Sequence, residues 1–438
     1  MAEQSQKNIE IFKRENKENN LKQTEIGSIP EDWEVVRLGE VLKEVDIRVK
    51  NLKNVNPENL TVLSLTKNYG LIPQTKRFKK RIAVKDVANY KIVRKLQIVH
   101  NPYVIWEGAI HALRTMEIEI VSPVYCVWEC KNNSDPSFID RLLRTPKLLN
   151  EYLARASGVV NRRRSVSKDD FLNIKIPLPP LPEQRKIARV LDKIQQAIEL
   201  QDRIIEQAKN LKKSLMQKLF TEGFYGEEQK ETEIGLIPKS WEVVRLGNIV
   251  TKTRQRDPKR MPYLKFKYVD VSSISNELYK IIEFREFFGK NAPNRARKEI
   301  KTGDIIFATV RPYLKRIAIV PQELDGELCS TAFCVLQCNM NFADHVFVFN
   351  YLLTDNFVER VSASQRGSSY PAVTDKDVLN QKIPLPPLSE QKQIAHILSV
   401  LDKKIEVEQK RKQVLKELFK TMLHKLMSGK IRLKEVEI

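Results

Sequence analysis

Two long segments of the chain contain neither glycine nor proline, and their apolar residues recur at alternating spacings of three and four. These segments run from Glu183 to Phe220 and from Glu390 to Met427. Such spacing gathers apolar side chains on one face of an α-helix, and over about five heptads it is typical of a coiled-coil seam. The seam positions are Leu191, Ile194, Ile198, Ile205, Leu215, Leu398, Leu401, Ile405, Leu415 and Phe419.

One such helix alone would leave its apolar face in water, so two of equal length predict a pair. We expect an intramolecular antiparallel coiled coil, a rod of roughly 57 Å at about 1.5 Å per residue, which holds two domains apart. Gln201 and Glu408 interrupt the seams at equivalent positions, 207 residues apart, and we expect them to set the register. Proline-rich stretches at 177–182 and 384–387 precede the helices and predict stiff joints.

Outside these helices the chain shows short apolar runs separated by turns, as β-strands do. The clearest runs are residues 60–65, 95–100 and 125–129 in the first half and 268–272, 304–309 and 317–320 in the second. The predicted fold class is therefore α+β, with two tandem-repeat α/β domains separated by two long helices that form an antiparallel coiled coil.

The chain contains an internal repeat. The 16 residues from Thr24 return from Thr232 with 13 identities, and the 16 residues from Asn173 return from Asn380 with 12 identities. The offsets, 208 and 207 residues, hardly drift, so a whole domain is duplicated. Residues 40–172 and 248–379 between these blocks share little. A duplicated enzyme would keep its catalytic residues in both copies, whereas two readers of different targets would keep the frame and diverge in the reading surface.

Charge narrows the choice of partner. With 76 Lys and Arg against 55 Asp and Glu, the net charge is +21, which favours nucleic acid and, less strongly, an anionic membrane surface. No segment has the roughly 18 consecutive apolar residues of a membrane span, and the first 20 residues are polar. We therefore expect a cytoplasmic protein with no membrane partner.

Clusters of basic residues are the candidate DNA contacts. Residues 251–316 alone hold 17 basic and 7 acidic side chains, a density suited to phosphates and, for arginine, to guanine edges. The candidates are Lys76, Arg77, Lys79, Lys80, Arg162, Arg163, Arg164, Arg254, Arg256, Lys259, Arg260, Arg295, Arg297, Arg311, Lys315 and Arg316. A solvated face is the alternative for any one cluster.

Catalytic and metal-binding signatures are absent from the sequence. Asn101-Pro102-Tyr103 lacks one proline of the Asn-Pro-Pro-Tyr that holds a flipped adenine, and no glycine-rich cofactor or phosphate loop accompanies it; we interpret it as a turn. Each half carries one Cys-x-x-x-Cys pair, without a nearby histidine, which fits thiols in a strand core better than zinc or a disulfide. We expect no catalytic residues, metal or cofactor in this chain.

These features together resemble the specificity subunits of type I restriction-modification enzymes. The resemblance covers about Thr24 to Leu433, and its marks are the Ile-Pro-x-x-Trp-x-x-x-x-Leu-Gly openings at Ile29 and Ile237, the Pro-Leu-Pro-Pro-Leu-x-Glu-Gln elbows at Pro177 and Pro384, and the helix after each. Strand-like Ser-Pro-Val-Tyr (122–125) and Ser-Thr-Ala-Phe (330–333) also fit the family. The first copy departs by having Lys95-Leu96-Gln97 where the second has a Gly-Asp-Ile run from Gly303.

The resemblance implies a non-catalytic subunit that reads a bipartite DNA sequence with two target recognition domains. It implies docking to two methyltransferase (M) subunits, which use S-adenosylmethionine, and to restriction (R) subunits, translocases that use ATP and Mg. The expected divisions are an N-terminal extension (1–23), recognition domain 1 (24–176), a helical region (177–223), recognition domain 2 (224–383), and a second helical region with the tail (384–438). A self-sufficient DNA methyltransferase or nuclease is the alternative, and a coiled-coil scaffold without DNA binding is a third.

Overall fold

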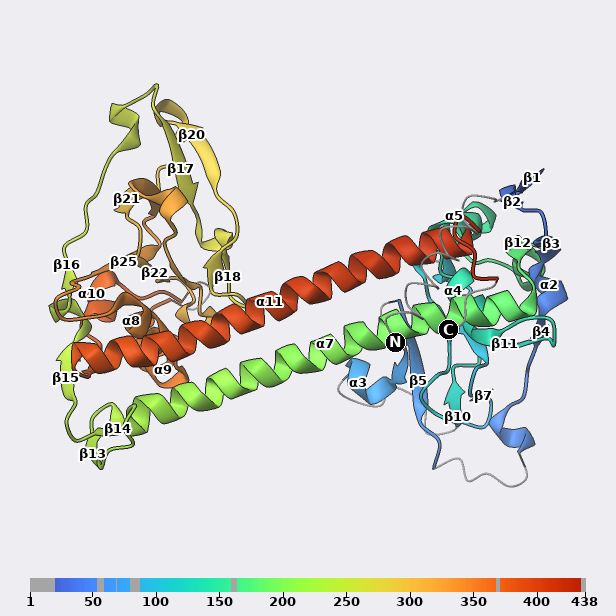
Figure 1. Ribbon diagram of the computed structural model, residues 1–438, viewed down its shortest axis with the longest axis horizontal. Helices are drawn as coiled ribbons and strands as arrows, with labels where there is room; N and C mark the ends of the chain where they lie inside the picture. The colour runs from blue at the N-terminus through green and yellow to red at the C-terminus, as the bar shows by residue number, and fades with distance from the viewer. Residues whose placement is uncertain are drawn as a thin grey trace, which may run out of the picture. The chain divides into compact units, whose positions relative to one another are not determined.

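The structure, a computed structural model, describes residues 20–52, 59–67, 69–78, 87–158, 164–367 and 371–434. The chain forms two compact units (Figure 1). Unit 1 contains the described residues up to Leu200 and those from Arg411 onward, and unit 2 contains Gln201–Lys410. Each unit thus combines one copy of the repeat with a part of each long helix.

Two four-stranded sheets form the body of unit 1, with strand orders β6-β5-β10-β7 and β4-β11-β8-β9. Their strands are β4 (Leu42–Glu44), β5 (Val62–Thr66), β6 (Gly70–Pro73), β7 (Lys91–Arg94), β8 (Ile98–His100), β9 (Ile110–Ala112), β10 (Ile118–Val121) and β11 (Cys126–Cys130). The short helices are α2 (Leu38–Val41), α3 (Gln74–Phe78), α4 (Pro136–Leu142), α5 (Pro146–Arg155) and α6 (Lys168–Leu172). Single 3-10 turns are η1 (Val49–Asn51) and η3 (Ile105–Glu107).

Unit 2 repeats this topology, with strand orders β20-β17-β24-β21 and β16-β25-β22-β23. Its strands are β16 (Val250–Thr251), β17 (Lys265–Val269), β20 (Arg285–Phe288), β21 (Ala296–Ile300), β22 (Ile305–Ala308), β23 (Ile317–Ile319), β24 (Glu327–Ser330) and β25 (Phe333–Cys338), with a ribbon of β18 (Ile274–Ser275) and β19 (Lys280–Ile281). The helices are α8 (His345–Leu352), α9 (Asp355–Ser362) and α10 (Asp375–Leu379). The 3-10 turns are η5 (Leu246–Asn248), η6 (Pro258–Arg260), η7 (Val271–Ser273), η8 (Gly289–Asn291), η9 (Pro312–Leu314) and η10 (Gln322–Leu324).

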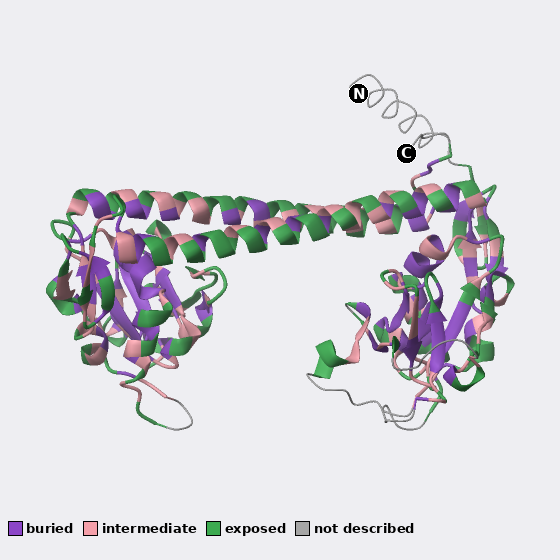
Figure 2. Ribbon diagram, turned by 90° about the horizontal axis from the view of Figure 1, so that it is seen from below, coloured by how far each residue is buried: buried purple, intermediate pink, exposed green. Residues whose placement is uncertain are grey.

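The two interiors share a fold although their sequences differ. The described residues of each contain a parallel pair, β5 with β10 and β17 with β24, flanked by antiparallel neighbours. Every run predicted as a strand overlaps an observed one, which confirms the α+β class. Apolar residues of both sheets are buried inside each unit (Figure 2). Successive side chains of β5 and β22 are buried, so these strands are covered on both faces.

The repeated sequence blocks form a small frame around each interior. Its hairpins are β1 (Leu21–Thr24) with β2 (Gly27–Pro30), and β13 (Gln229–Thr232) with β14 (Gly235–Pro238). Its two-stranded ribbons are β3 (Glu34–Arg37) with β12 (Lys175–Leu178), and β15 (Glu242–Arg245) with β26 (Lys382–Leu385). The frame therefore begins at Leu21, three residues before the predicted start of the first domain.

The long helices are α7 (Leu181–Glu222) and α11 (Leu388–Met427). Both begin two residues earlier than predicted. In α7 the first turn includes Pro182, which is tolerated there because its missing N–H has no partner within the helix. The early part of α7 shares the core of unit 1 with the end of α11, and the late part of α7 shares the core of unit 2 with the start of α11. In each unit the two helices are thus antiparallel, as predicted.

The side chains at the predicted seam positions are buried or half-buried, and the polar interruptions pair. Gln201 donates from Nε2 to Oε2 of Glu408 at 2.7 Å and to its backbone carbonyl at 3.2 Å. Lys212 donates to both carboxylate oxygens of Asp402 at 2.7 Å. Gln201 and Glu408 are equivalent in the repeat, so the contact joins a position to its own counterpart and supports their predicted role in register.

The Glu-Gln of each elbow ties its helix to the frame through the same contacts in both copies. Glu183 accepts the indole N–H of buried Trp33 at 3.1 Å, and Glu390 accepts that of Trp241 at 3.0 Å. The next residue, Gln184 or Gln391, is fully buried and caps the loop before α4 or α8; Gln184 accepts from the N–H of Asp135 at 2.8 Å. The Trp, Glu and Gln of these blocks are therefore kept in both copies, because these buried polar groups need each other as partners.

One turn keeps its geometry although its residues changed. Gly303, before β22, has φ +85°, and Leu96, 207 residues earlier and before β8, has φ +67°. In both copies the following residue, Asp304 or Gln97, accepts a backbone N–H with its side chain. The departure of the first copy from the family pattern is thus a substitution within a retained turn, with a leucine in the left-handed region that favours glycine.

The cysteines are free, and the paired ones occupy equivalent strands, β11 and β25. Burial raises the pKa of the Cys130, Cys334 and Cys338 thiols to about 12. A thiol held protonated in this way is a poor nucleophile and metal ligand. This agrees with the interpretation that they fill the cores of the strands.

Candidate DNA interface

The structure describes twelve of the sixteen candidate DNA contacts, whereas Lys79, Lys80, Arg162 and Arg163 lie outside the described residues. In unit 1 the described candidates are Lys76 and Arg77 on α3, and Arg164. Lys76 is exposed, and Arg77 is also exposed while donating to the carbonyl of Leu65 at 3.2 Å. Arg164 donates to the carbonyl of Ala156 at 3.0 Å.

Several candidates in unit 2 are engaged within the fold. Lys315 donates to the carboxylate of Asp355 at 2.5 Å and to the carbonyl of Leu353. Arg316 donates to the carbonyl of Val271 at 2.8 Å. Similar contacts hold Arg256 to the carbonyl of Gly326 and Arg297 to the carboxylate of Asp257. These side chains brace loops, and a DNA contact would require each to share or leave its present partner.

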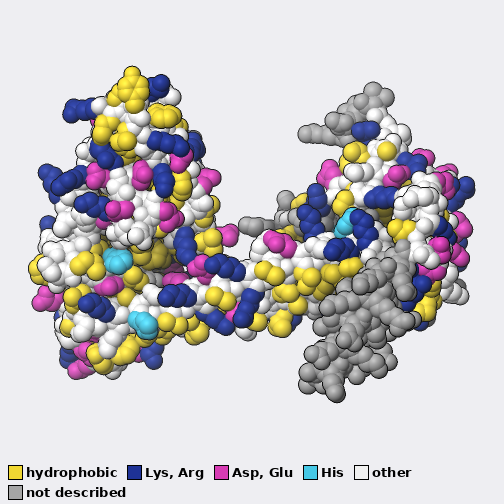
Figure 3. Space-filling view, turned by 45° about the horizontal axis from the view of Figure 1, so that its top comes forward, with side chains coloured by type: hydrophobic (Ala, Val, Ile, Leu, Met, Phe, Trp, Pro, Cys, Tyr) yellow, Lys and Arg dark blue, Asp and Glu magenta, His cyan; other side chains and the backbone are white. Residues whose placement is uncertain are grey.

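Other candidates in unit 2 are exposed on the loops that precede β17 and β21. Arg254, Lys259, Arg260 and Arg295 belong to this set. Lys259 also donates to Oδ1 of Asn294 at 2.8 Å, which links the two loops. Figure 3 shows lysine and arginine side chains spread over this unit. Because these exposed cations keep their hydration, they can meet phosphates without first breaking a buried ion pair.

The loop between β22 and β23 holds two candidates in strained backbone. Arg311 has φ +51° and Lys315 has φ +50°, and they bracket the single turn η9. The equivalent turn in unit 1, η3, ends at Gly108, which takes the same left-handed region at no steric cost. The turn presents Tyr313, half of whose surface is exposed. Strained backbone clusters at active sites and ligand-binding segments.

Sequence reasoning missed the exposed aromatic and apolar residues next to these cations. Tyr313 and the stretch Met261 to Leu264 are examples, because a count of charged residues does not detect them. Aromatic residues between lysines and arginines, as in Arg-Met-Pro-Tyr-Leu-Lys from 260 to 265, were the available signal, since nucleic-acid-binding surfaces combine cations with side chains that contact bases.

The titratable groups of the interior have structural partners. His100 is fully buried and its Nδ1 accepts the indole N–H of Trp128 at 2.8 Å. Burial lowers the pKa of His100 to about 3 and that of His111 to about 4, so both imidazoles are neutral at pH 7. Burial also raises the pKa of Asp304 to about 6.

Asn101-Pro102-Tyr103 forms a turn, as predicted. Among the described residues no group of His, Cys, Asp and Glu could hold a metal ion.

Comparisons with known proteins agree with this architecture. The family model of the type I restriction modification DNA specificity domain matches twice, over residues 30–210 and 238–417. A type I restriction enzyme MjaX specificity subunit from Methanocaldococcus jannaschii is 31% identical over 95% of this chain and 98% of its own length. The MjaVIII specificity subunit of the same organism is 30% identical over 96% and 98%. The type I restriction-modification S subunit from M. genitalium has the same fold, with a TM-score of 0.54, 17% identity, and coverage of 90% of this chain and 96% of its own.

The chain therefore belongs to the type I restriction modification DNA specificity family. Its two specificity domains in tandem make it a DNA-recognition subunit of a type I restriction-modification system, and it is not itself an enzyme. The duplicated frame explains why the family model matches twice at nearly the same spacing as the repeat.

Proposed function

We propose that each unit reads one half of a bipartite duplex DNA target through its divergent interior, with the shared frame and helices as support. The observation that carries this proposal is the contrast between the two parts of the repeat. The frame keeps its buried Trp–Glu and Gln contacts in both copies, whereas the loops that bear exposed cations differ in sequence. Exposed cations bind phosphates, and loop side chains that differ between the units can contact different bases.

The helices offer surface for protein partners. Besides its seam residues, α11 exposes Val400, Val407 and Val414, spaced by seven residues, with exposures of 51%, 46% and 64%. A seven-residue spacing keeps them on one side of the helix. We propose that this stripe contacts helices of two methyltransferase (M) subunits, and that restriction (R) subunits join through them.

The proposed division of labour leaves all cofactors on the partners. S-adenosylmethionine would be bound by the methyltransferase subunits, and ATP with Mg by the translocating restriction subunits. This chain would contribute recognition of the DNA sequence. We place the complex in the cytoplasm, where its DNA target is. No helix among the described residues is long and apolar enough to cross a membrane.

A salt titration of DNA binding tests the role of the exposed cations. The assembled complex would carry Arg254→Gln, Arg260→Gln and Arg295→Gln together. Each lost phosphate contact should flatten the slope of log affinity against log salt by about 0.9, so we expect a flatter slope and weaker binding.

The matched control removes three exposed lysines of the same unit that lie on its helix and frame, Lys213, Lys218 and Lys239, by the same change to Gln. The slope of this control should stay that of the wild type. Equal slopes for the two triple variants would contradict the assignment of DNA contact to the interior.

A further inference from the structure

The outer end of the β17–β20 ribbon in unit 2 exposes a cluster of apolar side chains. The tip, defined as residues 258–264 and 288–291, joins turns η6 and η8. Tyr263 is 82% exposed, Leu264 50%, Phe288 49% and Met261 36%. Hydrophobic side chains gather at this extremity of the unit in Figure 3, with cationic side chains beside them. Leaving several large apolar side chains in water on one small loop is unfavourable unless a partner covers them.

The tip has a defined backbone. The N–H of Gly289 donates to the carbonyl of Leu264 at 2.9 Å, and that of Lys290 donates to the carbonyl of Pro262 at 3.1 Å. A glycine is required at 289 for the two segments of the tip to lie this close, since a Cβ there would collide with the carbonyl oxygens of Met261 and Pro258. The apolar side chains are thus presented by a pre-formed loop, which reduces the entropy cost of binding.

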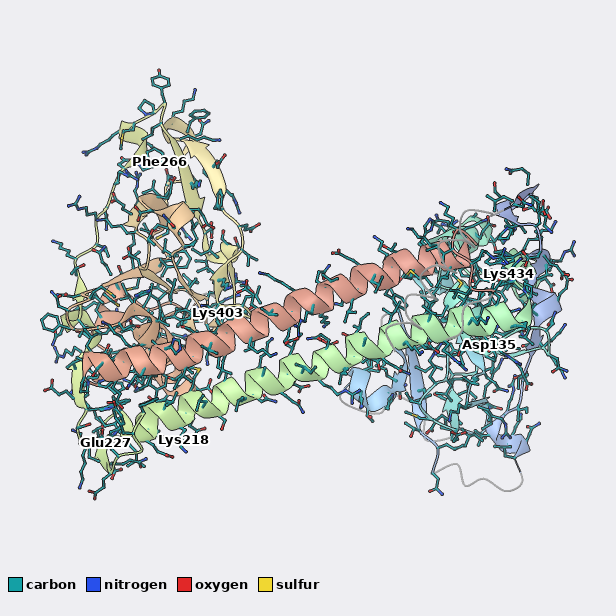
Figure 4. The ribbon with its side chains drawn as sticks, in the orientation of Figure 1. Asp135, Lys218, Glu227, Phe266, Lys403 and Lys434 are labelled. Atoms are coloured by element: carbon teal, nitrogen blue, oxygen red, sulfur yellow. The ribbon has the colours of Figure 1, made fainter. Side chains whose placement is uncertain are left out.

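The base of the tip is anchored in the interior. Asp257 caps η6 by accepting the N–H of Lys259 at 3.0 Å, and it also pairs with Arg297. Phe266, labelled in Figure 4 just below the tip, is buried and lies 5.1 Å from the guanidinium of Arg256. Two of the engaged arginines therefore serve to hold the tip in place.

Charge around the tip indicates the nature of its partner. The tip and the residue that follows its first segment, Lys265, carry four cations and no carboxylate; the cations are Lys259, Arg260, Lys265 and Lys290. All four are exposed, and Lys265 pairs with Glu286 of the neighbouring strand. A protein surface that received an apolar loop would need carboxylates around its rim to match these cations, whereas duplex DNA provides phosphates along both edges of each groove.

We infer that this tip is an apolar wedge that enters the minor groove of duplex DNA and partly unstacks one base step. The inference rests on the proposed function, because it assumes that unit 2 faces DNA. Met, Pro and Leu are among the side chains that proteins insert between base steps, with lysine and arginine on the adjacent phosphates. The wedge would bend the DNA and make recognition depend on the deformability of the contacted step.

The test uses the assembled complex and a mixed-sequence duplex with a fluorophore at each end. The variant carries Tyr263→Ala and Leu264→Ala, and the control carries Phe342→Ala, whose side chain is 57% exposed in the same unit outside the tip. Loss of the wedge should weaken binding by about tenfold or more, as removal of one stacked aromatic does. It should also abolish the rise in end-to-end energy transfer that reports bending. The salt slope should not change, because no charge is lost.

The controls separate this inference from the proposed function. Circular dichroism melts of both variants should match the wild type, because the replaced side chains are exposed. If the wild-type complex neither binds nor bends the duplex, the proposed function fails. Normal binding and bending by the Tyr263–Leu264 variant would overturn the wedge alone. Loss of the methyltransferase subunit from the purified complex, with DNA bending intact, would show that the tip docks protein, and this too would overturn it.

Discussion

Replacing Glu183 by Gln should destabilise unit 1 far more than the matched change Glu390→Gln destabilises unit 2. Both carboxylates accept a buried tryptophan N–H. Their second partners differ: Glu390 accepts the backbone N–H of Phe224 at 2.8 Å, whereas Glu183 accepts from Nε and Nη2 of Arg432, each at 2.8 Å. The substitution therefore removes a charged partner from a buried arginine, Arg432, in unit 1, but from neutral donors alone in unit 2.

The magnitude follows from burial. The side chain of Arg432 is 5% exposed and that of Glu183 3%, while Asp32, the other partner of Arg432, is 34% exposed. Burial alone would lower the pKa of Arg432, but Glu183 and Asp32 raise it overall, so Arg432 stays charged. Removing one partner of a buried ion pair costs about 3–5 kcal/mol. Weakening the two neutral-donor bonds of Glu390 costs about 1–2 kcal/mol.

Hydrogen exchange read peptide by peptide locates the effect. Glu183→Gln should raise exchange around Trp33 and in 428–434, and it should lower the melting temperature by roughly 6–12 °C for a loss of about 3 kcal/mol. The double variant Glu183→Gln with Arg432→Gln should recover part of the loss, because no buried charge remains. Equal losses for Glu183→Gln and Glu390→Gln, or exchange that rises evenly along the chain, would refute this reasoning.

Three further predictions concern the core and the helices. Because burial lowers the pKa of His100, unfolding takes up a proton below pH 6.5, so the stability that neutral His100 contributes is complete above that pH and is lost as the pH falls toward 3. Between pH 7 and pH 5, the free energy of unfolding measured in urea should fall by about 2 kcal/mol more in the wild type than in His100→Gln. Leu96→Gly should raise stability, by relief of its left-handed backbone, and Gly303→Ala should lower it by about 1 kcal/mol, both measured by thermal melts. Leu191→Asp, in a fully buried seam position, should unfold the local helix pair by circular dichroism, whereas Gln201→Leu should leave it folded but less selective in register, as disulfide trapping would show.

The sequence was sufficient to predict the long helices and the interior strands, because their signals are local or repeated. Seam spacing identified both long helices, and the offset of the repeat identified Gln201 and Glu408 as counterparts, which the structure brings into contact. Alternating apolar runs located the strands. The link between Trp33 and Glu183 was not predicted, since that contact joins positions 150 residues apart.

The interface could be predicted only as a set of charges. Whether a cation is available to DNA depends on the tertiary neighbours it meets: Lys315 pairs with Asp355, 40 residues away, whereas Arg295 remains exposed. The left-handed conformation of Leu96 could likewise not be predicted from the sequence, because leucine rarely adopts it and only the retained hydrogen bonds of the turn impose it.

Exchange of one interior tests the central claim, that the two units read their half-sites independently. Residues 40–172 would be replaced by the corresponding interior of another specificity subunit, with the frame and both helices retained. Methylome sequencing of cells that carry the partner subunits then reports the recognised sequence. We predict that one half of the target changes while the other half and the spacing between them stay as in the wild type. A change in both halves at once would contradict the account.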